Sequence, residues 1–152
     1  MIKFSYFLIL KLCLFSFLYA DESSPVKEII ITGNDAMQFD VKSFHAKARE
    51  NLSLTFKNIG SMPKIAMGHN LVILKKGINA ITFGQKVLAS GGSTTNPLPK
   101  SLLGDVVAHT KLLGPGESEV VIFQAPNETG EYEYVCTFPG HFAMMRGKMI
   151  IR

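Results

Sequence analysis

The sequence contains almost no cysteine, and this scarcity limits what can stabilise the chain. One of its two cysteines, Cys13, lies in an apolar N-terminal stretch that we interpret below as a cleaved signal, so the remaining chain keeps only Cys136. A disulfide framework of the kind found in small exported domains is therefore excluded. A lone thiol in an exported protein is oxidised unless it is buried or bound to a metal. We expect Cys136 to be a metal ligand.

Two further absences narrow the possible functions. The chain has no Cys-x-x-Cys-His segment, which excludes covalent attachment of a c-type haem. It also has no basic block interleaved with aromatic residues, so nothing in the sequence favours nucleic acid as a partner. Without Lys3 and Lys11, which belong to the N-terminal stretch, the formal net charge falls from +4 to +2.

The first twenty residues have the features of a secretory signal. A basic start ending at Lys3 precedes an apolar run over residues 4–18, and the small residue Ala20 ends the segment. We predict that residues 1–20 are a signal peptide and that residues 21–152 form one domain with no membrane span.

Two alternatives to a cleaved signal are open. A membrane anchor is disfavoured because the apolar run is short and Lys11 interrupts it. A lipoprotein site at Cys13 is disfavoured because Leu12 stands where a small residue is expected.

Hydrophobic patterns along residues 21–152 predict mainly β-structure. Short β-branched or alternating runs are bounded by turn residues such as Gly33-Asn34-Asp35. We predict strands over 28–32, 37–41, 52–57, 70–74, 105–110, 119–123, 131–136 and 148–151. A helical turn is expected within 43–50, and a short helix near 76–83 leads into an irregular loop. Seven or eight strands with one short helical insertion predict an all-β sandwich.

Soft and nitrogen donors gather near the C-terminus. Cys136 ends a predicted strand, His141 follows the Pro139-Gly140 turn, and Met145 precedes the last strand. One tight loop can therefore present two sulfurs and an imidazole to a single ion. A fourth candidate, His69, lies far upstream, where a loop enters an apolar strand. Met144 competes with Met145, and the loop length favours Met145.

This donor set indicates copper. Two histidines and a thiolate with a weak axial methionine are the ligands of blue-copper electron-transfer sites. Zinc prefers a closed tetrahedral set of cysteine, histidine or carboxylate, in which a thioether is a poor fourth ligand. Each residue alone is explained equally well by packing in a core, and only the joint spacing favours a site. His45 and His109 are expected to lie outside it.

The quoted motifs resemble those of azurins, which are bacterial blue-copper cupredoxins. The resemblance rests on Cys136-Thr137-Phe138-Pro139-Gly140-His141 with Met145, on Met67-Gly68-His69-Asn70, on Gly33-Asn34-Asp35 and on Ala108-His109-Thr110-Lys111-Leu112. It implies a cupredoxin-like Greek-key β-sandwich with one type 1 copper per chain. It also implies that the carbonyl of Gly68 is a distant fifth contact, that Asn70 ties the two ligand loops together, and that the Phe138 amide donates to the thiolate.

The chain departs from the azurin pattern in three places. Lys27 and Arg49 occupy the positions at which azurins usually carry a disulfide. Asn58 replaces a histidine that titrates with redox state in some members, so we expect no such pH coupling. Leu71 fills a core position that holds tryptophan in some azurins, and this chain has no tryptophan.

The resemblance implies a soluble periplasmic electron shuttle rather than an enzyme. Its partners would be c-type cytochromes and a terminal reductase or peroxidase, docking briefly at an apolar patch around His141. The patch residues implied by the family pattern are Met37, Met62, Ala66, Met67, Leu88, Phe138, Gly140, Ala143 and Met144. The alternative function is periplasmic copper storage or delivery. A nucleophilic enzyme using Cys136 and His141 lacks an orienting carboxylate in the sequence.

Overall fold

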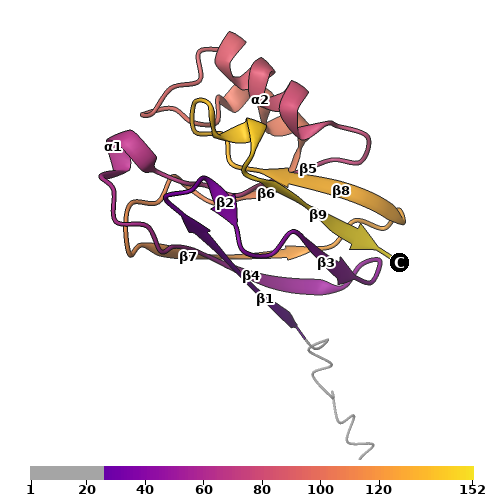
Figure 1. The fold of residues 1–152 in the computed structure, drawn as a ribbon. Coiled ribbons are helices and arrows are strands. Elements are labelled where there is room, and N and C mark those ends of the chain that lie inside the picture. Colours follow the sequence, from indigo (N-terminus) through magenta and orange to yellow (C-terminus); the bar gives the residue numbers. More distant parts are fainter. Residues whose placement is uncertain (1–25) are drawn as a thin grey trace, which may run out of the picture.

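The computed structural model describes residues 26–152, so the expected signal peptide over 1–20 lies outside the described residues. Two β-sheets pack face to face, and a helix covers the outer face of one of them (Figure 1). The strands are β1 Lys27–Asn34, β2 Gln38–Phe39, β3 Ser43–Ala46, β4 Asn51–Asn58, β5 Val72–Leu74, β6 Val106–His109, β7 Ser118–Gln124, β8 Gly130–Val135 and β9 Arg146–Ile151. The helices are α1 Lys64–Met67, α2 Ala80–Ala89 and the 3-10 turns η1 Lys100–Asp105 and η2 His141–Ala143.

The strand order confirms the β-sandwich. One sheet has the order β2-β1-β4-β7 and the other has the order β3-β9-β8-β5-β6. The pairs β1–β4 and β3–β9 are parallel, and the other pairs are antiparallel. The described residues contain nine strands instead of the predicted seven or eight: β2 lies within the predicted strand 37–41, and β3 is additional.

The expected helical turn within 43–50 is wrong, because β3 occupies its first half. Its side chains alternate, with Phe44 and Ala46 buried and Ser43 and His45 exposed. The composition of 43–50 favoured a helix, but parallel pairing with β9 and burial of Phe44 outweigh that weak local preference.

The predicted short helix is present but begins later. Gly77 has a positive φ of 82°, which ends the chain's extended path in a turn, and Asn79 then caps α2. The Asn79 side chain accepts hydrogen bonds from the backbone N–H groups of Ile81 and Thr82, both at 3.1 Å. The helix therefore spans Ala80–Ala89 instead of 76–83.

Strand β5 joins two hydrophobic clusters, as its continuous apolar run predicted. Ile73 faces the main core between the sheets, together with Leu54, Phe56 and Tyr134. Val72 and Leu74 face the opposite way, toward Phe83 and Val87 of α2. Both faces of β5 are thus buried, which fixes the strand that follows His69.

The helices within residues 26–152 are short. Neither α2 nor any other described helix has the length and apolar composition that crossing a bilayer requires.

Candidate metal centre

Cys136 follows β8 directly and projects into the core. Tyr132, Tyr134 and Cys136 all face the space between the sheets, as strand alternation predicted. The backbone N–H of Cys136 donates to the carbonyl of Met145 at 3.0 Å, so the start of the ligand loop is bonded to its end.

A tight turn returns the chain to place His141 beside Cys136. Gly140 adopts the left-handed conformation with φ of 84°, which glycine reaches without strain. The N–H of His141 donates to the carbonyl of Phe138 at 3.0 Å, and the two rings stack with centroids 4.4 Å apart. The carbonyl of His141 accepts from Met145 N–H at 2.8 Å.

Helix α2 supports this loop from outside, which the sequence analysis did not predict. Phe142 packs over Gly84, where any Cβ atom would overlap the phenyl ring. A glycine in the middle of an otherwise regular helix was the sequence signal for this close approach.

His69 is held from a separate part of the chain. Its N–H donates to the Leu113 carbonyl at 3.0 Å, and its carbonyl accepts from Leu113 N–H at 2.7 Å. The Leu113 carbonyl also accepts from Nδ2 of the fully buried Asn58 at 3.1 Å. Asn58, which replaces the titrating histidine of some azurins, therefore stabilises the His69 anchor with a group that does not titrate.

The three predicted donors converge. The Nδ1 atoms of His69 and His141 are 3.2 Å apart, and they lie 3.9 Å and 3.7 Å from the Cys136 sulfur. A point about 2.1 Å from all three atoms exists, which matches metal–nitrogen and metal–sulfur bonds of about 2.0–2.3 Å. These residues are the one group of metal-binding type identified in the part of the chain that the structure describes.

Burial prepares these donors differently. Burial, followed by the neighbouring His69, lowers the pKa of His141 to about 4, and burial also lowers the pKa of His69. Both imidazoles are therefore neutral near pH 7. Burial raises the pKa of the Cys136 thiol to about 12, against the opposing effect of the Asn70 and Phe138 backbone amides. The expected donation from the Phe138 amide is consistent with this opposing effect.

Three lone-pair-bearing atoms that face one another in a dry core repel unless a proton or cation lies between them. The Nε2 atom of His69 is buried and has no hydrogen-bond partner within residues 26–152. The backbone of Asn34 lies near the His69 ring and raises its pKa, which partly offsets the lowering by burial. The donor chemistry, two neutral imidazoles and a thiol, fits a copper ion.

Comparison with known proteins gives the same result for the chain as a whole. The model of the copper-binding proteins of the plastocyanin/azurin family matches residues 27–152. This chain belongs to that family. Its cofactor is copper, and the donor group of His69, Cys136 and His141 is consistent with a single type 1 copper.

Individual members of the family are similar along most of the chain. Azurin-2 from Alcaligenes xylosoxydans xylosoxydans is 39% identical over 127 residues, covering 80% of this chain and 95% of its own length. Outer membrane protein H.8 from Neisseria gonorrhoeae is 40% identical over 123 residues, and this match covers 80% of the chain but only 65% of that relative. The dithionite-reduced auracyanin of Roseiflexus castenholzii superposes with a TM-score of 0.71 at 31% identity, covering 83% of this chain and 97% of auracyanin.

Met145 and Gly68, which are also predicted to contact the metal in this cupredoxin, lie close in sequence to His141 and His69. Met145 is fully buried, whereas Met144 is 54% exposed. A Cβ atom on Gly33 would lie 2.6 Å from Met145 Cε, so a glycine in β1 leaves the space that Met145 fills. Gly68 is buried at the end of α1, where a Cβ atom would meet the Lys64 carbonyl at 2.6 Å. His45 and His109 are exposed and lie outside the donor group, as expected.

Asn70 connects the two ligand loops, as the resemblance implied. Its amide oxygen accepts from the Thr137 N–H at 2.8 Å, and its amide nitrogen donates to Thr137 Oγ1 at 2.8 Å. Both residues are buried. The neighbours of His69 and Cys136 are thereby fixed to each other.

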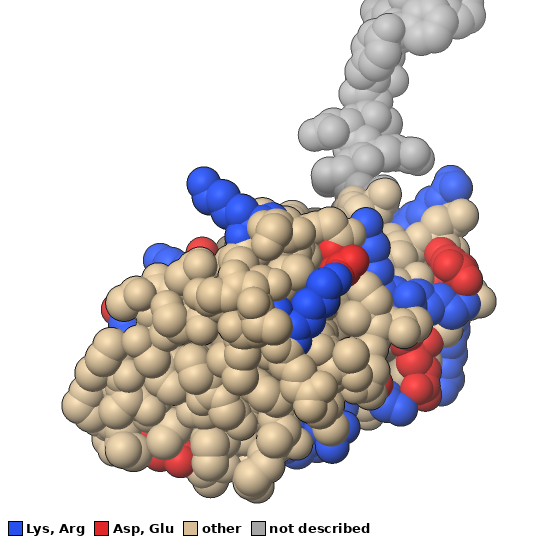
Figure 2. Space-filling view, turned by 90° about the horizontal axis from the view of Figure 1, so that it is seen from above, with Lys and Arg blue, Asp and Glu red and all other residues tan. Residues whose placement is uncertain are grey.

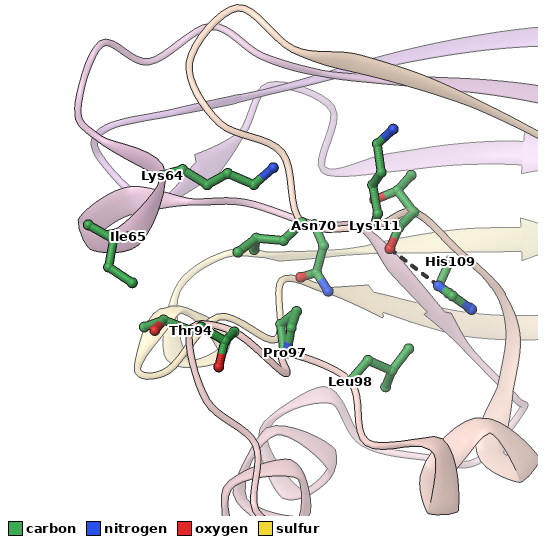
Figure 3. A pocket seen from close by; sticks show the side chains of 11 residues that line it. Lys64, Ile65, Asn70, Thr94, Pro97, Leu98, His109 and Lys111 are labelled. Atoms are coloured by element: carbon green, nitrogen blue, oxygen red, sulfur yellow. Dashed lines mark hydrogen bonds between the residues drawn. The ribbon is translucent and has the colours of Figure 1, made fainter.

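A hollow of about 680 Å³ lies beside the centre, between α1, the 94–98 loop and residues 109–112 (Figure 3). Asn70 forms part of its wall, and His109 stands near its edge, with Nδ1 3.2 Å from the Thr110 carbonyl. None of the three donors lines this hollow. It gives no substrate-sized access to the metal position.

One side of the molecule has few charged side chains. Figure 2 looks down on the α2 side, and a broad area at its lower left is nearly free of charged side chains. We use the name rim patch for the residues that the resemblance places around His141, apart from Phe138: Met37, Met62, Ala66, Met67, Leu88, Gly140, Ala143 and Met144. Met62, Leu88 and Met144 are 41%, 41% and 54% exposed, and Met37 and Met67 are half-buried. Phe138, expected in this patch, is instead 5% exposed beneath it because it stacks on His141.

Copper binding is expected to release one proton per ion near neutral pH. The two imidazoles are already neutral, whereas the Cys136 thiol must lose its proton to bind. Apparent affinity should therefore rise about tenfold per pH unit between about pH 5 and pH 8. Titrating the metal-free protein with Cu(II) in weakly buffered indicator solution measures this stoichiometry, and release of none or of two protons at pH 7 would contradict it.

Proposed function

We propose that this cupredoxin is a blue-copper electron carrier of the periplasm, which passes single electrons from c-type cytochromes to a terminal reductase or peroxidase. The observation that carries the proposal is the buried triangle of two imidazole nitrogens and one thiol sulfur, with sides of 3.2–3.9 Å. When bound there, copper supplies the Cu(I)/Cu(II) couple.

Copper would be held by His69, Cys136 and His141. The Met145 thioether would supply a further, weaker ligand, and the Gly68 carbonyl would be a more distant contact. Full burial of Met145 and its backbone hydrogen bond with Cys136 support its assignment over the exposed Met144.

Rigidity of the donors suits repeated one-electron exchange. Leu113 holds His69 through two backbone hydrogen bonds, and Met145 makes backbone hydrogen bonds with Cys136 and His141. Asn70 then joins the two ligand segments through Thr137. Because these contacts do not depend on the charge of the metal, the donors need little movement when the oxidation state changes.

His141 is the proposed point of electron entry and exit. It is 3% exposed, while His69, Cys136 and Met145 are each 0% exposed, so its ring is the donor nearest to solvent. The rim patch around it offers apolar side chains and no fixed charges. Such a surface suits brief docking through a small interface.

Burial of the donors disfavours copper storage or delivery, the alternative function. Proteins that hand over a metal need ligands that an incoming partner can reach, and these donors are at most 3% exposed. Loss of the bound copper to a chelator within minutes would support delivery over electron transfer. None of the three metal donors lines the neighbouring hollow, so the hollow does not support a catalytic role for the metal centre.

Electron exchange through the rim patch can be tested by introducing a charge. Met144→Lys is expected to slow electron transfer from a reduced c-type cytochrome about tenfold or more, because docking would desolvate the new ammonium group. The blue absorption should remain unchanged, since Met144 lies outside the donor group. Stopped-flow measurement of the blue band gives the rate.

Asn127→Lys provides the matched control, because Asn127 is exposed in the β7–β8 loop at the other end of the sandwich. It should leave the rate unchanged. Equal slowing by both variants, or by neither, would place the docking surface elsewhere.

A further inference from the structure

The outer face of the β1-β4-β7 sheet exposes an unusual number of aliphatic side chains. Ile30 of β1 is 63% exposed, and Val120 and Ile122 of β7 are 55% and 74% exposed. Outward positions of a sheet with one solvated face are normally polar. In Figure 1, α2 lies over the other sheet, and no described element covers this one.

Strand register places these side chains on one continuous surface. Ile30 pairs with Thr55, and Thr55 pairs with Val120, which makes one row across the three strands. The next row contains Glu28, Ser53 and Ile122, and the row on the other side contains Thr32, Lys57 and Ser118. We call these three rows the outer face.

Only two charged side chains lie on the outer face, and their signs are opposite. Glu28 lies on β1 in the row of Ser53 and Ile122. Lys57 lies on the neighbouring strand β4 in the row of Thr32 and Ser118. Both are exposed, and neither takes part in an ion pair within residues 26–152. The face therefore has zero net charge and an acidic and a basic end.

We propose that the outer face binds a second copy of this chain. A twofold axis across the strands, along the Ile30–Thr55–Val120 row, would lay Ile30 on its equivalent and Val120 on its equivalent. The same axis reverses the strand direction, so that the Glu28 end of each copy lies over the Lys57 end of the other. The face is then complementary to itself in its apolar row and in its charges, and self-complementarity is the requirement for a symmetric dimer.

A membrane or an unrelated protein fits these observations less well. Membrane-surface faces are rich in lysine and arginine, whereas this face is balanced. The antiparallel arrangement also sends the two metal centres to opposite ends of the dimer. Both rim patches consequently remain free.

The test is sedimentation of the purified protein between about 10 and 500 µM, the range in which a small interface associates. We expect a concentration-dependent dimer. Ile122→Lys should weaken the association about 100-fold, because it buries a charge against the partner's sheet. Leu103→Lys is the matched control: Leu103 is 41% exposed on η1, away from this face, and its replacement should have no effect.

Charge reversal distinguishes this dimer from general stickiness. Glu28→Lys alone and Lys57→Glu alone should each weaken association about tenfold, and the double variant should restore it, since both contacts are remade in reverse. A protein that stays monomeric at every concentration would overturn the proposal, and so would a dimer that Ile122→Lys leaves intact. Binding of the wild-type chain to phosphatidylcholine vesicles, lost in Ile122→Lys, would assign the face to lipid instead.

Discussion

Replacement of Cys136 by serine is expected to abolish the intense blue colour of the copper-loaded protein. That colour depends on the copper–thiolate bond of the blue-copper ligand set, and the chain has no other cysteine among its described residues. Serine preserves the size of the side chain but supplies a hydroxyl group that is a far poorer ligand at neutral pH. Adding Cu(II) to the purified variant and recording the visible spectrum measures the loss.

The matched control for this experiment is His109→Ala. His109 is an exposed histidine on β6, outside the donor group, and its removal should leave the spectrum unchanged. Retention of the blue band in Cys136→Ser, or its loss in His109→Ala, would contradict the assigned donor set.

Replacement of Asn70 by alanine is expected to lower the free energy of unfolding of the metal-free protein by about 2–4 kcal/mol. The change removes two hydrogen bonds of 2.8 Å and leaves the N–H and the hydroxyl group of Thr137 without their partner. Thr137 is 1% exposed, so water cannot readily replace the lost amide. Urea unfolding of the two proteins measures the difference.

Asn127→Ala serves as the control, because Asn127 is exposed and should cost little. Thr137→Val and the double variant complete a cycle. If the two residues act through each other, their combined cost should fall clearly below the sum of the single costs. A cost of Asn70→Ala below about 0.5 kcal/mol, the usual range for surface changes, would show that the bridge contributes little.

The sequence predicted the sandwich well where alternation was strong. In β4 the burial of side chains alternates over the whole strand, and in β8 it alternates from Glu131 to Tyr134, with these side chains on the predicted faces. β3 was missed because four residues with a single large apolar side chain give too short a pattern. Its pairing with β9, about a hundred residues later in the chain, is a long-range contact that local patterns do not reveal.

The donor group was predictable because its residue types are rare and closely spaced. Cys136 and His141 lie in one short loop, and His69 stood out because it precedes an apolar strand. The support around the donors was less accessible to sequence reasoning. The contact of Phe142 with Gly84 depends on where α2 crosses the sheet, and the burial of Phe138 depends on its stacking with His141.

All three donors come from one sheet, at the ends of the adjacent strands β5 and β8 and in the loop that leads to β9. A metal bound to His69 and Cys136 would also cross-link the unfolded chain across 67 residues. A covalent bridge closing a loop of that length would remove about 4 kcal/mol of chain entropy from the unfolded state. A domain whose described residues hold a single cysteine can thus obtain from its cofactor the kind of restraint that disulfide-bonded proteins obtain by pairing two thiols.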